Sequence, residues 1–172
     1  LRAFLPRELT LLRSMLQHGT FSPLTTSAGR LFDAVASLID LCQHIRFEGQ
    51  AAMALEFALE GVATDETYHF TLIDLPSPDI LDWAPVIEAV IEDNQAGLPA
   101  GIISAKFHNA LVDLIVTVAR HEGIERVALT GGCFQNKYLM ERAVTHLQAA
   151  GFRPYWHQRV PPNDGGIALG QL

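Results

Sequence analysis

Val127-Ala128-Leu129-Thr130-Gly131-Gly132-Cys133-Phe134-Gln135-Asn136 joins an apolar strand to the start of a helix through two adjacent glycines. A glycine turn at this place lets backbone N–H groups approach a phosphate or a sugar closely, because no Cβ intervenes. The same glycines could instead serve only tight packing of the strand against the helix. The turn matches neither the Walker A loop nor GxGxxG. Asn136 could cap the helix, or it could reach a ribose or phosphate oxygen.

A second glycine pair lies near the end of the chain, in Pro161-Pro162-Asn163-Asp164-Gly165-Gly166. Asp164 is placed to cap a helix that starts there, which alone would explain the residue. Alternatively, its carboxylate lies at the carboxyl edge of a sheet and holds a divalent cation beside a phosphate.

Two further polar clusters open helices in the first third of the chain. In Thr26-Ser27-Ala28-Gly29-Arg30-Leu31-Phe32-Asp33, Arg30 and Asp33 could form a plain surface ion pair at i,i+3 spacing. Asp33 could instead accept hydrogen bonds from two ribose hydroxyls. In Phe47-Glu48-Gly49-Gln50, Glu48 is favourable near a helix N-terminus whatever its function.

Apolar periodicity predicts an α/β fold in which helices predominate. Alternating strands and helices in the last half indicate an α/β layer with parallel strands. We expect a single domain over residues 1–172, with a helical part over about 1–62 and an α/β part over about 63–172. The predicted helices are 6–17, 27–41, 47–60, 82–96, 102–121 (the central core helix), 136–150 and a last one from Asp164; the predicted strands are 68–75, 126–129 and 153–157.

The composition restricts the partners and the compartment. A net charge of −7 argues against nucleic acid as a partner, since phosphate binding needs clustered Lys and Arg. Cys42 and Cys133 lie in unrelated contexts, so we expect a reducing cytoplasm and no zinc site. No uninterrupted apolar run is long enough to span a membrane, so we expect no membrane partner.

The sequence contains no self-contained catalytic constellation. The seven histidines are dispersed, without an HExxH motif, and most are expected at the surface or at helix ends. No GxSxG elbow is present either. Cys133 is a candidate thiol, but small buried cysteines are commoner than nucleophiles. No residue is assigned as a general base.

Taken together, the stretches Thr26–Asp33, Phe47–Glu56, Leu129–Asn136 and Pro162–Gly170 resemble the C-terminal part of HypF, the carbamoyltransferase of NiFe-hydrogenase maturation. The resemblance runs from about Leu5 to the last residue. It implies one lobe of an actin/Hsp70-like (ASKHA) ATPase fold, helix-rich with a small mixed or parallel sheet. The chain would then be the C-terminal lobe of a larger multidomain enzyme.

The resemblance also implies a reaction. Carbamoyl phosphate is processed upstream, ATP is consumed and a carbamoyl-adenylate forms. The carbamoyl group passes to the C-terminal Cys of a HypE-like acceptor protein, where dehydration gives a cyano ligand for the hydrogenase iron. Adenylation suits this transfer, since it gives a poor carbamate electrophile a good leaving group, AMP.

Matching the family's motifs residue by residue gives expected roles. The nucleotide-contacting residues are Asp33 (at the ribose), Glu48, Gly49, Gly131, Gly132 and Asn136. Asp164 matches a carboxylate that binds Mg²⁺ or another divalent metal. The family completes that site with two histidines four residues apart in the preceding lobe, and this sequence has no such pair. We therefore expect one wall of an active site, with little or no activity alone.

Two other readings remain open. The chain could be a non-catalytic interaction module whose helical first third docks a partner. It could also be a sugar-kinase-like enzyme of the same fold, or one that makes threonylcarbamoyl-adenosine on tRNA, although the acidic charge disfavours tRNA. All four polar and glycine clusters fall at helix starts, which favours the carbamoyltransferase.

Overall fold

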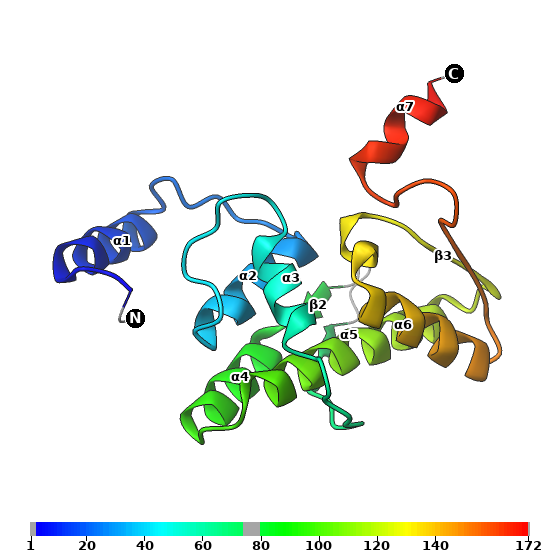
Figure 1. The fold of residues 1–172 in the computed structure, drawn as a ribbon, viewed down its shortest axis with the longest axis horizontal. Coiled ribbons are helices and arrows are strands. Elements are labelled where there is room, and N and C mark those ends of the chain that lie inside the picture. Colours follow the sequence, from blue (N-terminus) through cyan, green and yellow to red (C-terminus); the bar gives the residue numbers. More distant parts are fainter. Residues whose placement is uncertain (1–2, 74–79, 172) are drawn as a thin grey trace.

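The structure is a computed structural model that describes residues 3–73 and 80–171. Most of its helices pack along one long central helix, α5, whereas α1 lies apart and contains no buried residue (Figure 1). The elements in chain order are α1 (Pro6–His18), α2 (Ala28–Leu38), α3 (Gln50–Phe57), β1 (Thr71–Ile73), β2 (Ile80–Asp82), α4 (Ala84–Gln95), α5 (Ala100–Glu122), β3 (Arg126–Leu129), η1 (Gly132–Gln135), α6 (Lys137–Ala149), β4 (Arg153–Trp156), η2 (Asp164–Gly166) and α7 (Ile167–Gly170).

The first three helices form where the sequence predicts them, with shifted ends. α1 stops at Gly19, which adopts the left-handed conformation at φ 64°, as expected. α2 ends before the predicted Leu41, because the chain turns at Asp40 with φ 58°. α3 begins after the predicted Phe47, because Gly49 has φ 80° and breaks the helical path immediately before Gln50.

The core is organised by α5, which confirms its prediction as the central helix. Its first half buries Ile103 and Phe107 against α2, α3 and α4, and its second half buries Val116 against β3 and α6. A Cβ at Gly101 would overlap the carbonyl oxygen of Ala58, so glycine allows the close approach of the segment after α3. The helix is long and apolar enough to cross a membrane, yet most of its apolar window is buried within the protein.

The α/β layer consists of β3, α6 and β4. The two strands are parallel, with Arg126 opposite Arg153 and Leu129 opposite Trp156. Because parallel neighbours end at the same edge, the segments that follow Leu129 and Trp156 leave the sheet side by side. This arrangement confirms the predicted parallel strands and places the turn that carries Gly131 near the segment that carries Asp164.

The middle of the chain departs from the prediction. The strand predicted over 68–75 is only Thr71–Ile73, and the last two positions lie outside the described residues. Tyr68 instead turns into the core, where its hydroxyl donates to Asp93 Oδ2 at 2.7 Å. An unpredicted strand, β2, pairs antiparallel with β1, so the described residues contain two separate two-stranded sheets.

Two predicted helix starts also move. α4 begins at Ala84 rather than at Asp82, because Asp82 belongs to β2 and its Oδ1 accepts the N–H of Ala84 at 3.0 Å. The last helix begins at Ile167, after the short turn η2. Asn163 caps η2 by accepting the N–H of Gly165 at 3.1 Å, so the capping role predicted for Asp164 belongs to its neighbour.

Candidate functional site

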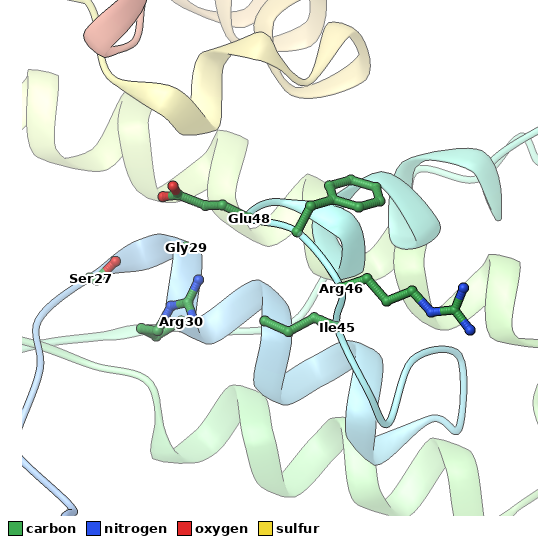
Figure 2. A pocket seen from close by; sticks show the side chains of 7 residues that line it. Ser27, Gly29, Arg30, Ile45, Arg46 and Glu48 are labelled. Atoms are coloured by element: carbon green, nitrogen blue, oxygen red, sulfur yellow. The ribbon is translucent and has the colours of Figure 1, made fainter.

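A cavity of about 520 Å³ lies between the start of α2 and the loop that leads into α3. Its volume is in the range of small-molecule sites. In Figure 2, the side chains of Glu48 and Arg46 extend in opposite directions from this loop. The cavity brings together two of the predicted clusters, which are far apart in sequence; its lining residues are Ser27, Gly29, Arg30, Ile45, Arg46, Phe47 and Glu48.

Asp33 lies one helical turn behind the cavity lining. Its Oδ2 pairs with Arg30 Nη1 at 2.7 Å, which confirms the i,i+3 ion pair. That oxygen is buried, and the pair lacks the alignment of a hydrogen bond, so the atom retains hydrogen-bonding capacity. Arg30 itself is partly exposed and lines the cavity. A ligand that displaced Arg30 could therefore reach the Asp33 carboxylate.

The loop into α3 supplies Glu48 and Gly49. Glu48 is exposed and lines the cavity. Gly49 occupies the N-cap position of α3 with φ 80°, a left-handed conformation that favours glycine. Its carbonyl oxygen accepts the N–H of Met53 at 2.9 Å. The glycine thus turns the chain sharply, so that Glu48 lies at the edge of the cavity.

The turn after β3 contains two glycines that differ physically. Gly131 adopts φ 99° and ψ 162°, a conformation that side chains strongly disfavour, and its N–H donates to Pro162 O at 2.9 Å. Gly132 has no positive φ, and a Cβ there would meet only the Asn163 Cβ, at 4.0 Å. Within the described structure, therefore, backbone geometry demands glycine at 131 but nothing demands it at 132.

Asn136 caps α6, as the sequence predicts for its structural role. Its Oδ1 accepts the N–H of Leu139 at 2.9 Å, and its Nδ2 lies 2.9 Å from His108 Nε2. The residue is 7% exposed. Glu56 of α3 accepts the N–H of Lys137 at 2.7 Å. The N–H groups of Lys137 and Leu139 are thus already bonded within the protein. An anion would therefore bind to the backbone of the glycine turn that precedes α6, not to these N–H groups of the helix.

Asp164 follows the cap of η2 and is exposed. Its side chain makes no hydrogen bond or ion pair with the residues that the structure describes. No group of three His, Cys, Asp or Glu side chains in residues 3–73 and 80–171 could hold a metal ion. Asp164 can serve as one ligand, but the described residues do not form a metal site by themselves.

The other three predicted clusters all contact the glycine turn or the start of α6 that follows it. α2, which carries Asp33, contacts η1. Glu56, at the end of the second predicted cluster, reaches the start of α6, and Pro162 joins the last cluster to Gly131. The glycine turn is therefore the common neighbour of the other clusters, although Asp164 stands on its own exposed turn.

Sequence reasoning missed several residues beside these clusters. Thr130 Oγ1 lies 3.0 Å from His157 Nε2, which joins the carboxyl ends of β3 and β4. The sequence could have indicated this contact, because both residues directly follow a strand.

His108 is fully buried, unlike most of the histidines, which are exposed as predicted. Burial raises the pKa of the Cys133 thiol, which opposes a nucleophilic role.

The family model described as "Carbamoyltransferase, Kae1-like Domain, second subdomain" matches residues 2–171. The chain belongs to the HypF family. HypF of Synechocystis sp. is 48% identical over 161 residues, which are 94% of this chain and 21% of that protein. HypF of Rhodobacter capsulatus is 35% identical over 96% of this chain and 21% of its own length.

Solved HypF structures have the same fold. A full-length HypF in a phosphate- and nucleotide-bound form superposes with a TM-score of 0.89 at 36% identity, over 99% of this chain and 23% of that one. HypF of T. kodakarensis superposes at 0.77 with 24% identity, over 95% of this chain and 21% of its own, and shows the fold alone. The predicted helix-rich α/β fold is confirmed. The chain spans about a fifth of the length of these HypF proteins.

Proposed function

We propose that this chain forms the ATP-contacting wall of the carbamoyl-transfer site of a longer HypF enzyme. The observation that carries the proposal is Gly132. Its neighbours in the described structure leave room for a Cβ, and its backbone does not require glycine. A glycine in an exposed turn that the protein's own packing does not need fits a ligand whose phosphate or sugar approaches the backbone closely.

The other family-matched residues would surround the nucleotide from the helical side. Asp33 keeps an acceptor oxygen free of well-directed hydrogen bonds, as a carboxylate that binds ribose hydroxyls needs. Glu48 lines the cavity and Gly49 turns the loop that carries it, and these two residues would lie near the nucleoside. Gly131 shapes the turn that presents Gly132, and Asn136 anchors its exit by capping α6. None of these residues needs to react covalently.

Transfer through a carbamoyl-adenylate is the proposed reaction. A carbamate oxygen attacks the α-phosphate of ATP and pyrophosphate leaves. The thiolate of the C-terminal Cys of a HypE-like acceptor then attacks the carbamoyl carbon, and AMP leaves with the electron pair of the broken C–O bond. This chain's contribution is to bind and orient the nucleotide, since orientation lowers the barrier of both displacements.

The metal site would be shared with another part of the enzyme. Asp164 supplies one oxygen ligand for Mg²⁺ or another divalent ion, and the remaining ligands come from outside this chain. The chain alone is therefore expected to be inactive. We place the enzyme in the cytoplasm, with carbamoyl phosphate, ATP and the acceptor protein as its partners.

Calorimetry with Mg-ATP on the full-length enzyme tests the proposal. Asp33→Ala should weaken nucleotide binding by roughly tenfold, which is the scale of one or two hydrogen bonds to a charged group. Asp65→Ala is the matched control, because Asp65 pairs with Arg142 at 3.0 Å without lining the cavity. Equal affinity in the wild type and Asp33→Ala would refute the nucleotide role and favour an interaction module.

A further inference from the structure

His108, in the middle of α5, is 0% exposed and has a partner at each ring nitrogen. Nδ1 lies 2.7 Å from the carbonyl oxygen of Ser104, and Nε2 lies 2.9 Å from Asn136 Nδ2. A carbonyl oxygen can only accept, so Nδ1 carries the proton. Nε2 then offers a lone pair, and the amide of Asn136 donates to it. The two contacts thus fix both the tautomer of the histidine and the orientation of the amide.

The surroundings of His108 keep its ring neutral and in place. Burial lowers its pKa to about 4, although the hydrogen bond to the Ser104 carbonyl opposes the shift. The rings of Phe32, Phe107 and Tyr138 contact it edge-on, with centroids 5.5, 5.8 and 5.5 Å away. The ring therefore has neither room to rotate nor a second charge state near neutral pH.

The hydrogen-bond chain leads from His108 directly to the glycine turn. Asn136 donates to His108 and accepts the N–H of Leu139, so both the nitrogen and the oxygen of its amide are engaged. Asn136 is also the residue at which η1 ends and α6 begins. If its amide turned over, it would lose both bonds at once, because the oxygen would then face Nε2 and the NH₂ would face an N–H.

We propose that His108 is a positioning residue for the nucleotide-contacting turn, acting through Asn136. By holding the cap of α6, it fixes the exit of the turn and hence the place of Gly132. The inference rests on the proposed nucleotide role of that turn. A histidine that only filled the core would need its ring contacts but not its Nε2 lone pair, and this difference can be tested.

Two substitutions separate the ring from the lone pair. His108→Phe keeps an aromatic ring among Phe32, Phe107 and Tyr138 but removes the acceptor. His108→Gln loses ring contacts but can present a carbonyl oxygen to Asn136. In the full-length enzyme, His108→Phe should raise KM for ATP on the order of tenfold and His108→Gln should raise it less, because a displaced turn weakens nucleotide binding.

Val90→Ala on α4 is the matched control for lost stability, because Val90 is fully buried in the core cluster that contains Phe32 and Phe107, two of the rings around His108. It should lower the melting temperature and leave KM for ATP unchanged. Asn136→Ala should raise KM at least as much as His108→Phe, because it also removes the cap of α6. The double variant should add little to Asn136→Ala, since that variant already lacks the bond to His108.

Each outcome has a separate meaning. If Gly132→Ala raises KM for ATP but His108→Phe does not, the positioning role is refuted and the nucleotide role stands. If neither change alters KM, the proposed nucleotide role of the turn fails. Fully additive effects of His108→Phe and Asn136→Ala on KM would also overturn the inference, because the two residues would then act independently.

Discussion

Glu56 of α3 accepts a hydrogen bond from the backbone N–H of Lys137 at the start of α6, with Oε1 2.7 Å from N. The bond links the second predicted cluster to the helix that follows the glycine turn. A carboxylate at a helix N-terminus also interacts favourably with the helix dipole. The bond thus joins α3 to α6 beside the candidate site.

Removing that carboxylate should destabilise the protein measurably. Glu56→Ala leaves the Lys137 N–H without its partner, and we expect a loss of about 1 kcal/mol in the free energy of unfolding, the size of the effect of losing one side-chain hydrogen bond at a helix start. Urea denaturation measures it. Glu60→Ala is the control, because Glu60 is exposed. Equal losses in the two variants would show that the α3–α6 bond contributes nothing specific.

Gly132→Ala should separate stability from binding. The added Cβ meets only an ordinary contact with Asn163, so the urea midpoint should stay unchanged. Nucleotide affinity should fall on the order of tenfold, because the methyl group occupies the space of the ligand. Gly151→Ala should instead lower the urea midpoint and leave nucleotide affinity unchanged, since Gly151 has φ 88° and no role at the site. A Gly132→Ala enzyme with wild-type affinity would show that no ligand approaches this backbone.

Cys133 should behave as an inert thiol. Burial raises its pKa, so the reactive thiolate is scarce at neutral pH. We expect slow alkylation by iodoacetamide at pH 7.5, measured by mass spectrometry of the native protein, and full carbamoyl-transfer activity in Cys133→Ala. Loss of activity in Cys133→Ala, with both stability and nucleotide affinity unchanged, would instead support a nucleophilic role.

The buried His108 should make the protein less stable in mild acid. Its pKa is about 4 when folded and 6.5 when exposed, so below pH 6.5 the unfolded chain binds a proton that the folded protein does not. Stability is therefore present above pH 6.5 and lost as the pH falls toward 4, by about 3 kcal/mol in all. Urea unfolding at several pH values measures this slope.

His108→Gln is the control for that pH dependence, because it removes the titrating group and should flatten the slope between pH 6.5 and 4. Asp93 acts at lower pH. Burial tends to raise the pKa of its carboxyl, but hydrogen bonds from Lys106 and Tyr68 outweigh burial and lower it below 3.8. Its stabilisation is lost only as the pH falls below that value. An unchanged slope in His108→Gln would assign the acid sensitivity to another group.

The sequence predicted the α/β layer because strands and a helix alternate there: β3 is a short apolar run, and glycines separate β3 from α6 and α6 from β4. It predicted β1 as part of a longer strand over 68–75 and missed β2, which is only three residues long and too short to display alternation. Pro76 and Pro78 follow β1 in the sequence and indicated the end of a strand, so nothing in the sequence indicated a second strand soon afterwards.

For the site, short motifs predicted residues but not their contacts. Periodicity places Ser104 and His108 on one face of α5, together with apolar neighbours, and that pattern could have indicated a buried histidine. It cannot show that His108 meets Asn136 or that Glu56 meets Lys137, because both contacts join segments distant in sequence. Such pairings depend on how helices pack in three dimensions.

The parallel pair of β3 and β4 bears on the solubility of the isolated chain. Arg153 N–H donates to Glu125 O, so successive N–H groups of β4 alternate between the side of β3 and the outer edge. Position 154, which faces outward, is a proline without a donor. β3 has no second partner strand among the described residues, so its outer edge is the better template for pairing. Because the described part of this sheet offers one usable edge, association through it at high concentration should stop at pairs instead of growing into fibrils.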